Sequence, residues 1–176
     1  MTRFEEGAVL VLPQHGVCRV VGYEKSEYQT YANARRIEYL AIVRISDDRV
    51  FLLESSRLEE IGIRPPVAVA DIPMVIEQLR TPPRHISTLW ARRWKAHAAL
   101  LKTGEVLDIA CVVRNMYHFA QTSTLSTAEK LMYDRSLTNL TNELAHSMNT
   151  SEEAAATLIA DALKAGLKVK RKPKKA

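Results

Sequence analysis

Long apolar runs are absent from this chain of 176 residues. A helix that crosses a bilayer needs roughly 18 to 20 consecutive apolar residues, and no segment approaches that length. The first residues, Met1 to Glu6, also lack the apolar core of a secretory signal. The sequence therefore predicts a cytoplasmic protein that makes no contact with a membrane.

Cysteine is scarce, with two residues, Cys18 and Cys111, that lie far apart in the chain. Without a Cys-x-x-Cys pair, a disulfide framework or a complete cysteine zinc site is not expected. Each cysteine is predicted to be a small buried hydrophobic residue. His15 and Cys18 have a spacing that could begin a metal site, but a turn histidine beside a buried cysteine is the simpler interpretation. We expect no metal and no cofactor.

The motifs of common enzyme classes are also missing. The chain has no glycine-rich phosphate loop, no His-Glu-x-x-His and no Gly-x-Ser-x-Gly. The five histidines are dispersed, at His15, His85, His97, His118 and His146. The sequence therefore predicts a protein that is not an enzyme.

The net charge of +5 is unevenly distributed along the chain. Residues 162–176 hold seven Lys or Arg and no acid, which leaves a net charge of −2 on the rest. Residues 167–176 are predicted to be a disordered basic tail, which could serve solubility or make weak contacts with DNA or RNA. Residues 78–104 are a second segment with an unusual charge distribution, because they carry six basic residues and no acid.

Residues 1–64 have the pattern of a small all-β module. β-branched and aromatic residues occur there in short runs separated by turn residues, and Ser46 to Asp48 forms a tight hairpin. Closure of five short strands would hide the sheet edges, so we predict a Tudor-like or SH3-like β-barrel. The predicted strands are 8–12, 17–24, 37–45, 49–53 and 61–63.

Arg64-Pro65-Pro66 ends the β pattern, because consecutive prolines cannot continue a ladder. Residues 65–166 are predicted to be a compact all-α helical bundle, so the fold class is α+β with two domains. Three helices are predicted at 71–80, 87–102 and 105–120, with Asp71 and Ser87 as caps of the first two. Capping boxes at Ser126 to Glu129 and at Thr150 to Glu153 open two more.

The acid-free stretch places two tryptophans on one of these helices. Trp90 falls in its first turn, close to Arg92, Arg93 and Lys95. A flat aromatic ring beside cations that bind phosphate can stack on bases or wedge between them. Trp94, continued by Ala98 and Leu101, fits a stripe that faces the core, and Trp90 could share that face. Periodicity alone therefore does not decide whether Trp90 is exposed.

Several motifs share their order and spacing with a single known family. They are Gly7 to Val17, Glu24, Glu38 to Leu40, Ile61 to Arg64, Trp90 to Arg93, Lys102 to Gly104, Ile109 to Met116 and Leu125 to Lys130. Together they resemble the CarD/CdnL family of bacterial transcription regulators that bind RNA polymerase, and the likeness runs from about Phe4 to about Ala145.

The resemblance implies a different binding partner for each of the two domains. Residues 1–64 would be a Tudor-like domain that binds the β subunit of RNA polymerase. Residues 65–166 would bind promoter DNA without sequence specificity, with Trp90 inserted at the upstream edge of the transcription bubble. We therefore expect a monomer in the active complex that stabilises the open complex and lies with polymerase at the nucleoid. The predicted DNA-binding residues are Trp90, Arg92, Arg93, Lys95 and Arg84.

The polymerase-binding surface departs from the family at two positions. Ser26 and Leu52 stand where better-known members can carry arginines that touch polymerase. Lys25 and Arg49 are the candidates to replace those charges. We expect docking by strand addition along 49–53, so the predicted polymerase-binding residues are Lys25, Arg49, Phe51, Leu52 and Leu53. The alternative is an adaptor on polymerase whose Trp90 surface binds another protein instead of DNA.

Overall fold

The computed structural model describes residues 3–30 and 33–168, with side chains for 3–26 and 36–168. The chain divides into two compact units, Met1–Pro66 and Val67–Ala176. The division falls at the end of the predicted Arg64-Pro65-Pro66 break. The first unit is built on a β-sheet and the second is helical, so the predicted α+β fold class is confirmed.

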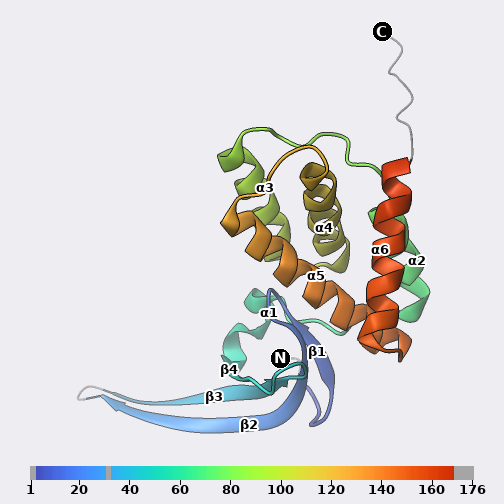
Figure 1. Ribbon diagram of the computed structural model, residues 1–176. Helices are drawn as coiled ribbons and strands as arrows, with labels where there is room; N and C mark the ends of the chain where they lie inside the picture. Colours follow the sequence, from blue (N-terminus) through green and yellow to red (C-terminus); the bar gives the residue numbers. More distant parts are fainter. Residues whose placement is uncertain (1–2, 31–32, 169–176) are drawn as a thin grey trace. The chain divides into compact units, whose positions relative to one another are not determined.

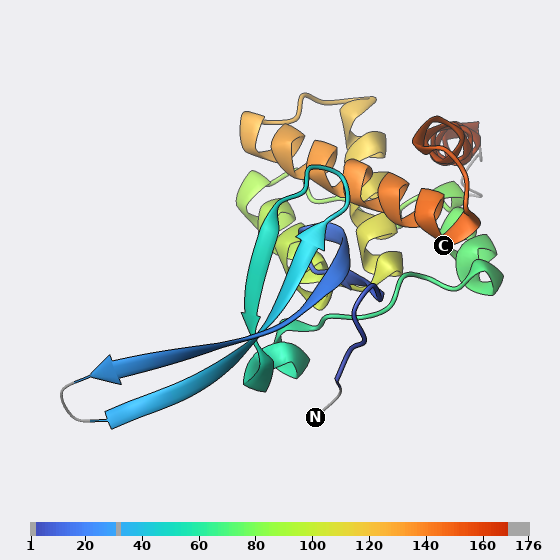
Figure 2. The same ribbon diagram turned by 90° about the horizontal axis from the view of Figure 1, so that it is seen from below.

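The first unit contains a four-stranded antiparallel sheet in which the strands follow one another in chain order (Figure 1). Its strands are β1 (Val9–Leu12), β2 (Gly16–Thr30), β3 (Asn33–Arg44) and β4 (Val50–Glu54). β2 and β3 are longer than predicted, and they continue as a two-stranded hairpin beyond β1 and β4 (Figure 2). Main-chain pairing between the two strands runs to Thr30 of β2 and Asn33 of β3. β3 begins at Asn33, earlier than the predicted 37, and 31–32 lie outside the described residues.

The predicted fifth strand at 61–63 is wrong. The chain after β4 forms a short 3₁₀ turn, η1 (Ser55–Arg57), and then the helix α1 (Leu58–Ile61). Gly62 ends α1 with a φ of 73°, a left-handed conformation that glycine adopts without strain. Arg64 then pairs with Val11 as an isolated bridge. The apolar pattern at 61–63 therefore reflects packing against the sheet and not a strand.

The hydrophobic core of the first unit lies between the sheet and α1. Its buried members are Leu10, Leu12, Cys18, Val20, Leu40, Ile42 and Leu58. Phe51 and Leu53 of β4 pack against this cluster from the sheet edge, with their side chains half-buried. The first unit therefore has a core of its own, as an independent domain requires.

The two cysteines should differ in their reactivity toward iodoacetamide. Cys18 is buried, as predicted, and burial raises the pKa of its thiol to about 11. At pH 8 only about one Cys18 in a thousand would be a thiolate, the reactive form. Cys111 is half-buried, so the prediction that both cysteines are buried is wrong for this one.

We therefore expect Cys111 in the folded protein to be alkylated at least about ten times faster than Cys18 at pH 8. Peptide mass spectrometry measures both rates. The same reaction in urea is the control, and there the two rates should converge. Equal rates in the folded protein would contradict the burial of Cys18.

The second unit contains all five predicted helices among the described residues. They are α2 (Ile72–Arg80), α3 (Trp90–Thr103), α4 (Val106–Ala120), α5 (Thr127–Met148) and α6 (Glu152–Lys168), with a 3₁₀ turn η2 (Val69–Asp71) before α2. α4 packs against α2, α3 and α5, and α6 packs against α2 and α5. α6 includes the first two residues of the predicted tail, 167–168, and 169–176 lie outside the described residues.

The helix caps agree with the sequence in part. Ser126 caps α5 in the predicted capping box, and Asp71 is the N-cap residue of α2 but makes no side-chain cap hydrogen bond. α6 is capped by Ser151 and not by Thr150, because the Ser151 hydroxyl accepts from the Ala154 N–H at 3.2 Å. The Ser87 cap is also wrong, since Leu89 is the N-cap residue of α3. No helix in the described part of the chain is both long enough and apolar enough to cross a bilayer.

Candidate nucleic-acid interface

α3 begins at Trp90, later than predicted, and its start is exposed. Leu89, at the N-cap position, has extended backbone and makes no side-chain cap hydrogen bond. Its own N–H donates to the Ser87 hydroxyl at 3.3 Å, so Ser87 shapes the approach to the helix. Leu89 is 61% exposed and Trp90 is 49% exposed. Two large apolar side chains therefore meet solvent at a helix N-terminus, where the backbone dipole favours anions.

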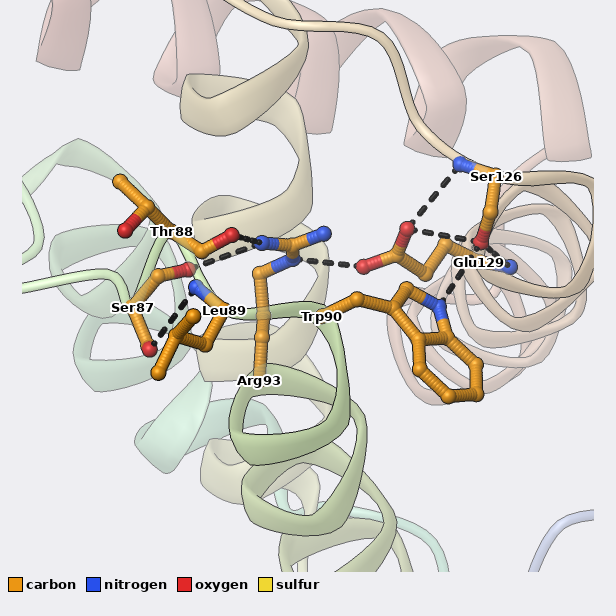
Figure 3. Close-up of polar contacts among 7 residues, drawn as sticks. All are labelled: Ser87, Thr88, Leu89, Trp90, Arg93, Ser126 and Glu129. Atoms are coloured by element: carbon orange, nitrogen blue, oxygen red, sulfur yellow. Dashed lines mark hydrogen bonds and ion pairs between the residues drawn. The ribbon is translucent and has the colours of Figure 1, made fainter.

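The indole of Trp90 is held in place although half of it is exposed. Its ring stacks on that of Trp94, with centroids 6.0 Å apart and planes 21° from parallel. Its Nε1–H donates to the Ser126 hydroxyl at 3.1 Å (Figure 3). Ser126 precedes α5, so this bond joins the starts of two helices. The free face of the ring is therefore presented in one orientation.

Arg93 lies on the buried side of α3, and both Nε and Nη1 of its guanidinium donate hydrogen bonds. The side chain is 5% exposed, and its Nε donates to Glu129 Oε1 at 2.5 Å. Its Nη1 donates to the carbonyl oxygens of Ser87 and Thr88 at 2.8 and 3.2 Å (Figure 3). The guanidinium also lies over the Phe119 ring, 3.8 Å from the centroid. Arg93 therefore anchors the segment before α3 and is not presented to a ligand in solvent.

Glu129 completes this arrangement from α5. It is 1% exposed, and its Oε2 accepts from the Ser126 N–H at 3.0 Å and from the Ser126 hydroxyl at 2.8 Å. Burial by itself would raise the pKa of Glu129, but hydrogen bonds from Arg93 and Ser126 together with the Arg93 charge lower it below its ordinary value. The carboxylate is therefore ionised at neutral pH, as the pair with Arg93 requires.

The buried side of α3 is polar, which corrects the predicted stripe. Its buried residues are Arg93 and His97, whereas Trp94 and Ala98 are half-buried. Burial, followed by the neighbouring Arg93 charge, lowers the pKa of His97, so this imidazole is neutral at neutral pH. Leu101 does pack against the core clusters, as predicted. The sequence missed the polar face because an arginine in the acid-free stretch is ordinarily exposed.

The other predicted cations are exposed. Arg92 and Lys95, three residues apart, share the side of α3 opposite its buried residues. Arg84 is exposed in the segment that leads to α3. The start of α3 thus combines an exposed indole with exposed positive charge. Ser126 and Glu129 were not predicted as part of this site, and their capping box was the signal that could have drawn attention to them.

β4 forms the second surface of interest, because it is the last strand in the sheet order and pairs with β3 alone among the described residues. The Arg44 N–H donates to the Arg49 carbonyl at 2.9 Å, so these two residues form a hydrogen-bonded pair. Hydrogen-bonded and non-hydrogen-bonded pairs then alternate along β3 and β4. In this register the N–H groups of Val50 and Leu52 point away from β3. These two residues are 60% and 51% exposed, and in the described part of the chain no further strand pairs with this edge.

The remaining polymerase-site predictions lie on β2 and on or directly before β4. Lys25 on β2 is exposed. The Arg49 side chain is 63% exposed, and its Nε lies 3.8 Å from an Asp47 carboxylate oxygen. Phe51 is half-buried and contacts His15, with ring centroids 4.8 Å apart. No group of three or more His, Cys, Asp or Glu side chains in the described part of the chain could hold a metal ion.

Comparison with known proteins assigns the chain to a class. Residues 74–160 match the family model described as CarD, C-terminal domain. A protein of Bacillus subtilis (strain 168) named "Putative transcription factor YdeB" is 23% identical over 141 residues, which cover 80% of this chain and 90% of that relative. With the two-unit fold, these matches define a transcription regulator. Residues 74–160 therefore match the CarD C-terminal domain, and the two matches support the CarD/CdnL resemblance that the motifs predicted.

Proposed function

We propose that this regulator binds the β subunit of RNA polymerase through β4 and stabilises the promoter open complex by placing Trp90 against the upstream edge of the bubble. The observation that carries the DNA contact is the half-exposed indole held at the start of α3 beside exposed positive charge. A tryptophan that only packs in the core is expected to be more deeply buried than this one. In this proposal the first unit binds polymerase and the second unit contacts DNA.

The open edge of β4 supports docking by strand addition. Outward N–H and C=O groups on an edge strand are a ready template for a strand of another protein. Val50 and Leu52 offer apolar side chains beside these groups, while Phe51 and Leu53 keep the strand packed on its own core. Lys25 and Arg49 add positive charge, which suits an acidic partner surface.

The DNA contact is weak by itself and depends on this tether. Arg92, Lys95 and Arg84 would bind backbone phosphates, which position a protein without reading sequence. Attachment to polymerase raises the effective concentration of these groups at the promoter. The Trp90 ring then stacks at the junction of duplex and melted DNA, where it slows reclosure. Arg93 is left out of the phosphate-binding set, because Glu129 neutralises its charge in the interior.

We expect Trp90→Ala to shorten the lifetime of the open complex about tenfold. An aromatic ring stacked on a base contributes about 1 to 3 kcal/mol, and about 1.4 kcal/mol is a factor of ten. The lifetime is measured by competitor challenge of preformed complexes, with polymerase binding measured in parallel. Met74→Ala, which truncates a 55% exposed side chain on α2, is the matched control and should change neither quantity. An unchanged lifetime for Trp90→Ala with intact polymerase binding would overturn the DNA contact.

An adaptor function is the second candidate, because the exposed pair Leu89 and Trp90 would also suit an apolar pocket of a protein. Footprinting of promoter complexes with and without the regulator distinguishes the two. Protection or altered melting at the upstream edge of the bubble supports DNA contact. An unchanged footprint together with altered transcription supports the adaptor.

A further inference from the structure

The Ser126 hydroxyl uses all of its hydrogen-bonding capacity at the junction of α3 and α5. A serine hydroxyl has one hydrogen to donate and two lone pairs that accept. It donates to Glu129 Oε2 at 2.8 Å and accepts from the Glu129 N–H at 3.3 Å. The remaining lone pair accepts the Trp90 Nε1–H at 3.1 Å. Because a carboxylate only accepts, the hydroxyl hydrogen is committed to Glu129, and the lone pairs are left for the two N–H donors.

The position of Glu129 is itself held by α3. Arg93 binds its other carboxylate oxygen, and Arg93 follows Trp90 by about one helical turn. The contacts therefore run from Trp90 to Ser126, to Glu129, to Arg93 and back to α3, and they close a ring between the two helix starts (Figure 3). Both charged members are buried, whereas the indole is half-exposed.

We propose that Ser126 is a positioning residue that holds the Trp90 indole, before DNA arrives, in the orientation it uses against DNA. This inference rests on the function proposed above. An exposed tryptophan without this bond would sample several rotamers, and fixing one of them on binding would reduce affinity. The linked contacts of Ser126, Glu129 and Arg93 select one rotamer of Trp90 before DNA binds. The capping box of α5 therefore serves the DNA contact as well as its own helix.

The first test examines the indole in the full-length protein without DNA. The chain has two tryptophans, so a ¹⁵N-labelled sample gives two indole N–H resonances, which Trp94→Phe assigns. Ser126→Gly removes the hydroxyl, yet glycine at an N-cap costs only about a few tenths of a kcal/mol relative to serine. We expect the Trp90 indole N–H in Ser126→Gly to exchange with solvent about 2 to 10 times faster, as loss of one hydrogen bond implies. The Trp94 resonance is the internal control, and Ser126→Thr, which keeps a hydroxyl, should restore slow exchange.

The second test examines the open complex formed with polymerase and promoter DNA. Ser126→Gly should shorten its lifetime about 2- to 10-fold, and Ser126→Thr should leave it close to the parent value. In a Trp90→Ala background, Ser126→Gly should have no further effect, because the group it positions is gone. An additive effect in that background would mean that Ser126 acts only through its helix, and would overturn the proposal.

The two tests separate failure of this inference from failure of the proposed function. Unchanged indole exchange in Ser126→Gly would overturn the positioning role, whatever Trp90→Ala does to the open complex. An unaltered lifetime in Trp90→Ala would overturn the function against DNA, and with it the purpose of the positioning. A shorter lifetime in Trp90→Ala together with an unaltered one in Ser126→Gly would overturn the positioning role alone.

Discussion

Glu129→Ala is expected to destabilise the helical unit by about 3 to 5 kcal/mol, the usual result of removing one partner from a buried ion pair. The Arg93 guanidinium, 5% exposed, would keep its burial and lose its counter-charge. The Ser126 N–H would lose its carboxylate acceptor as well. Urea unfolding followed by tryptophan fluorescence measures the effect. Both tryptophans, Trp90 and Trp94, lie in the helical unit, so the signal reports this unit and not the sheet.

Two comparisons identify the cause of this loss. Asp134→Ala removes an exposed carboxylate from the same helix and should change stability by no more than about 0.5 kcal/mol. Replacing both Arg93 and Glu129 by methionine should recover part of the loss, because no charge is then left buried without a partner. A cost for Glu129→Ala as small as that of Asp134→Ala would show that the pair does not support the unit.

The same carboxylate links stability to pH. The pKa of Glu129 in the folded protein lies below its ordinary value, so the folded state favours the ionised form. The contribution of ionised Glu129 to the stability of the fold is complete at a pH above the ordinary pKa. This contribution is lost as the pH falls through the lower pKa of the folded state. The difference in stability between the parent and Glu129→Gln should therefore shrink as the solution is acidified through this range.

Leu52→Pro is expected to weaken binding to the polymerase β subunit about 10- to 100-fold. Proline has no N–H, and in this register the Leu52 N–H points away from β3, so the sheet keeps its own ladder. An acceptor on the partner strand would be buried without a donor, which costs about 1 to 3 kcal/mol. Binding of the full-length protein to the isolated β subunit, measured by calorimetry, reports the change.

Leu52→Ala is the matched control, because it removes the side chain and keeps the N–H. If docking uses the strand backbone, Leu52→Ala should weaken binding much less than Leu52→Pro. Circular dichroism before and after the substitution checks that the sheet persists. Equal and small effects of the two variants would refute strand addition at β4 and direct attention to another surface of the first unit.

Local sequence signals were sufficient for most of the architecture. Helices close to 72–80, 106–120 and 127–148 were predicted from the sequence, and for the last of them the Ser126 to Glu129 capping box identified the helix start to the residue. The strands β1 and β4 follow from short apolar runs rich in β-branched and aromatic residues and bounded by turn residues. The errors fall where contacts with another segment of the chain decide the outcome. Main-chain pairing extends β2 and β3, and packing against the sheet turns 58–61 into a helix.

The sequence by itself determined that residues 78–104 carry positive charge around a tryptophan, because composition and helical spacing are local properties. Only the tertiary structure decided how those charges are used. Glu129 lies 36 positions beyond Arg93 in the chain, and their contact turns one cation from a ligand for phosphate into a buried support. The same contact places Ser126 where it can hold Trp90 half-exposed. No pattern within α3 contains that information, since the acid that neutralises Arg93 belongs to another helix.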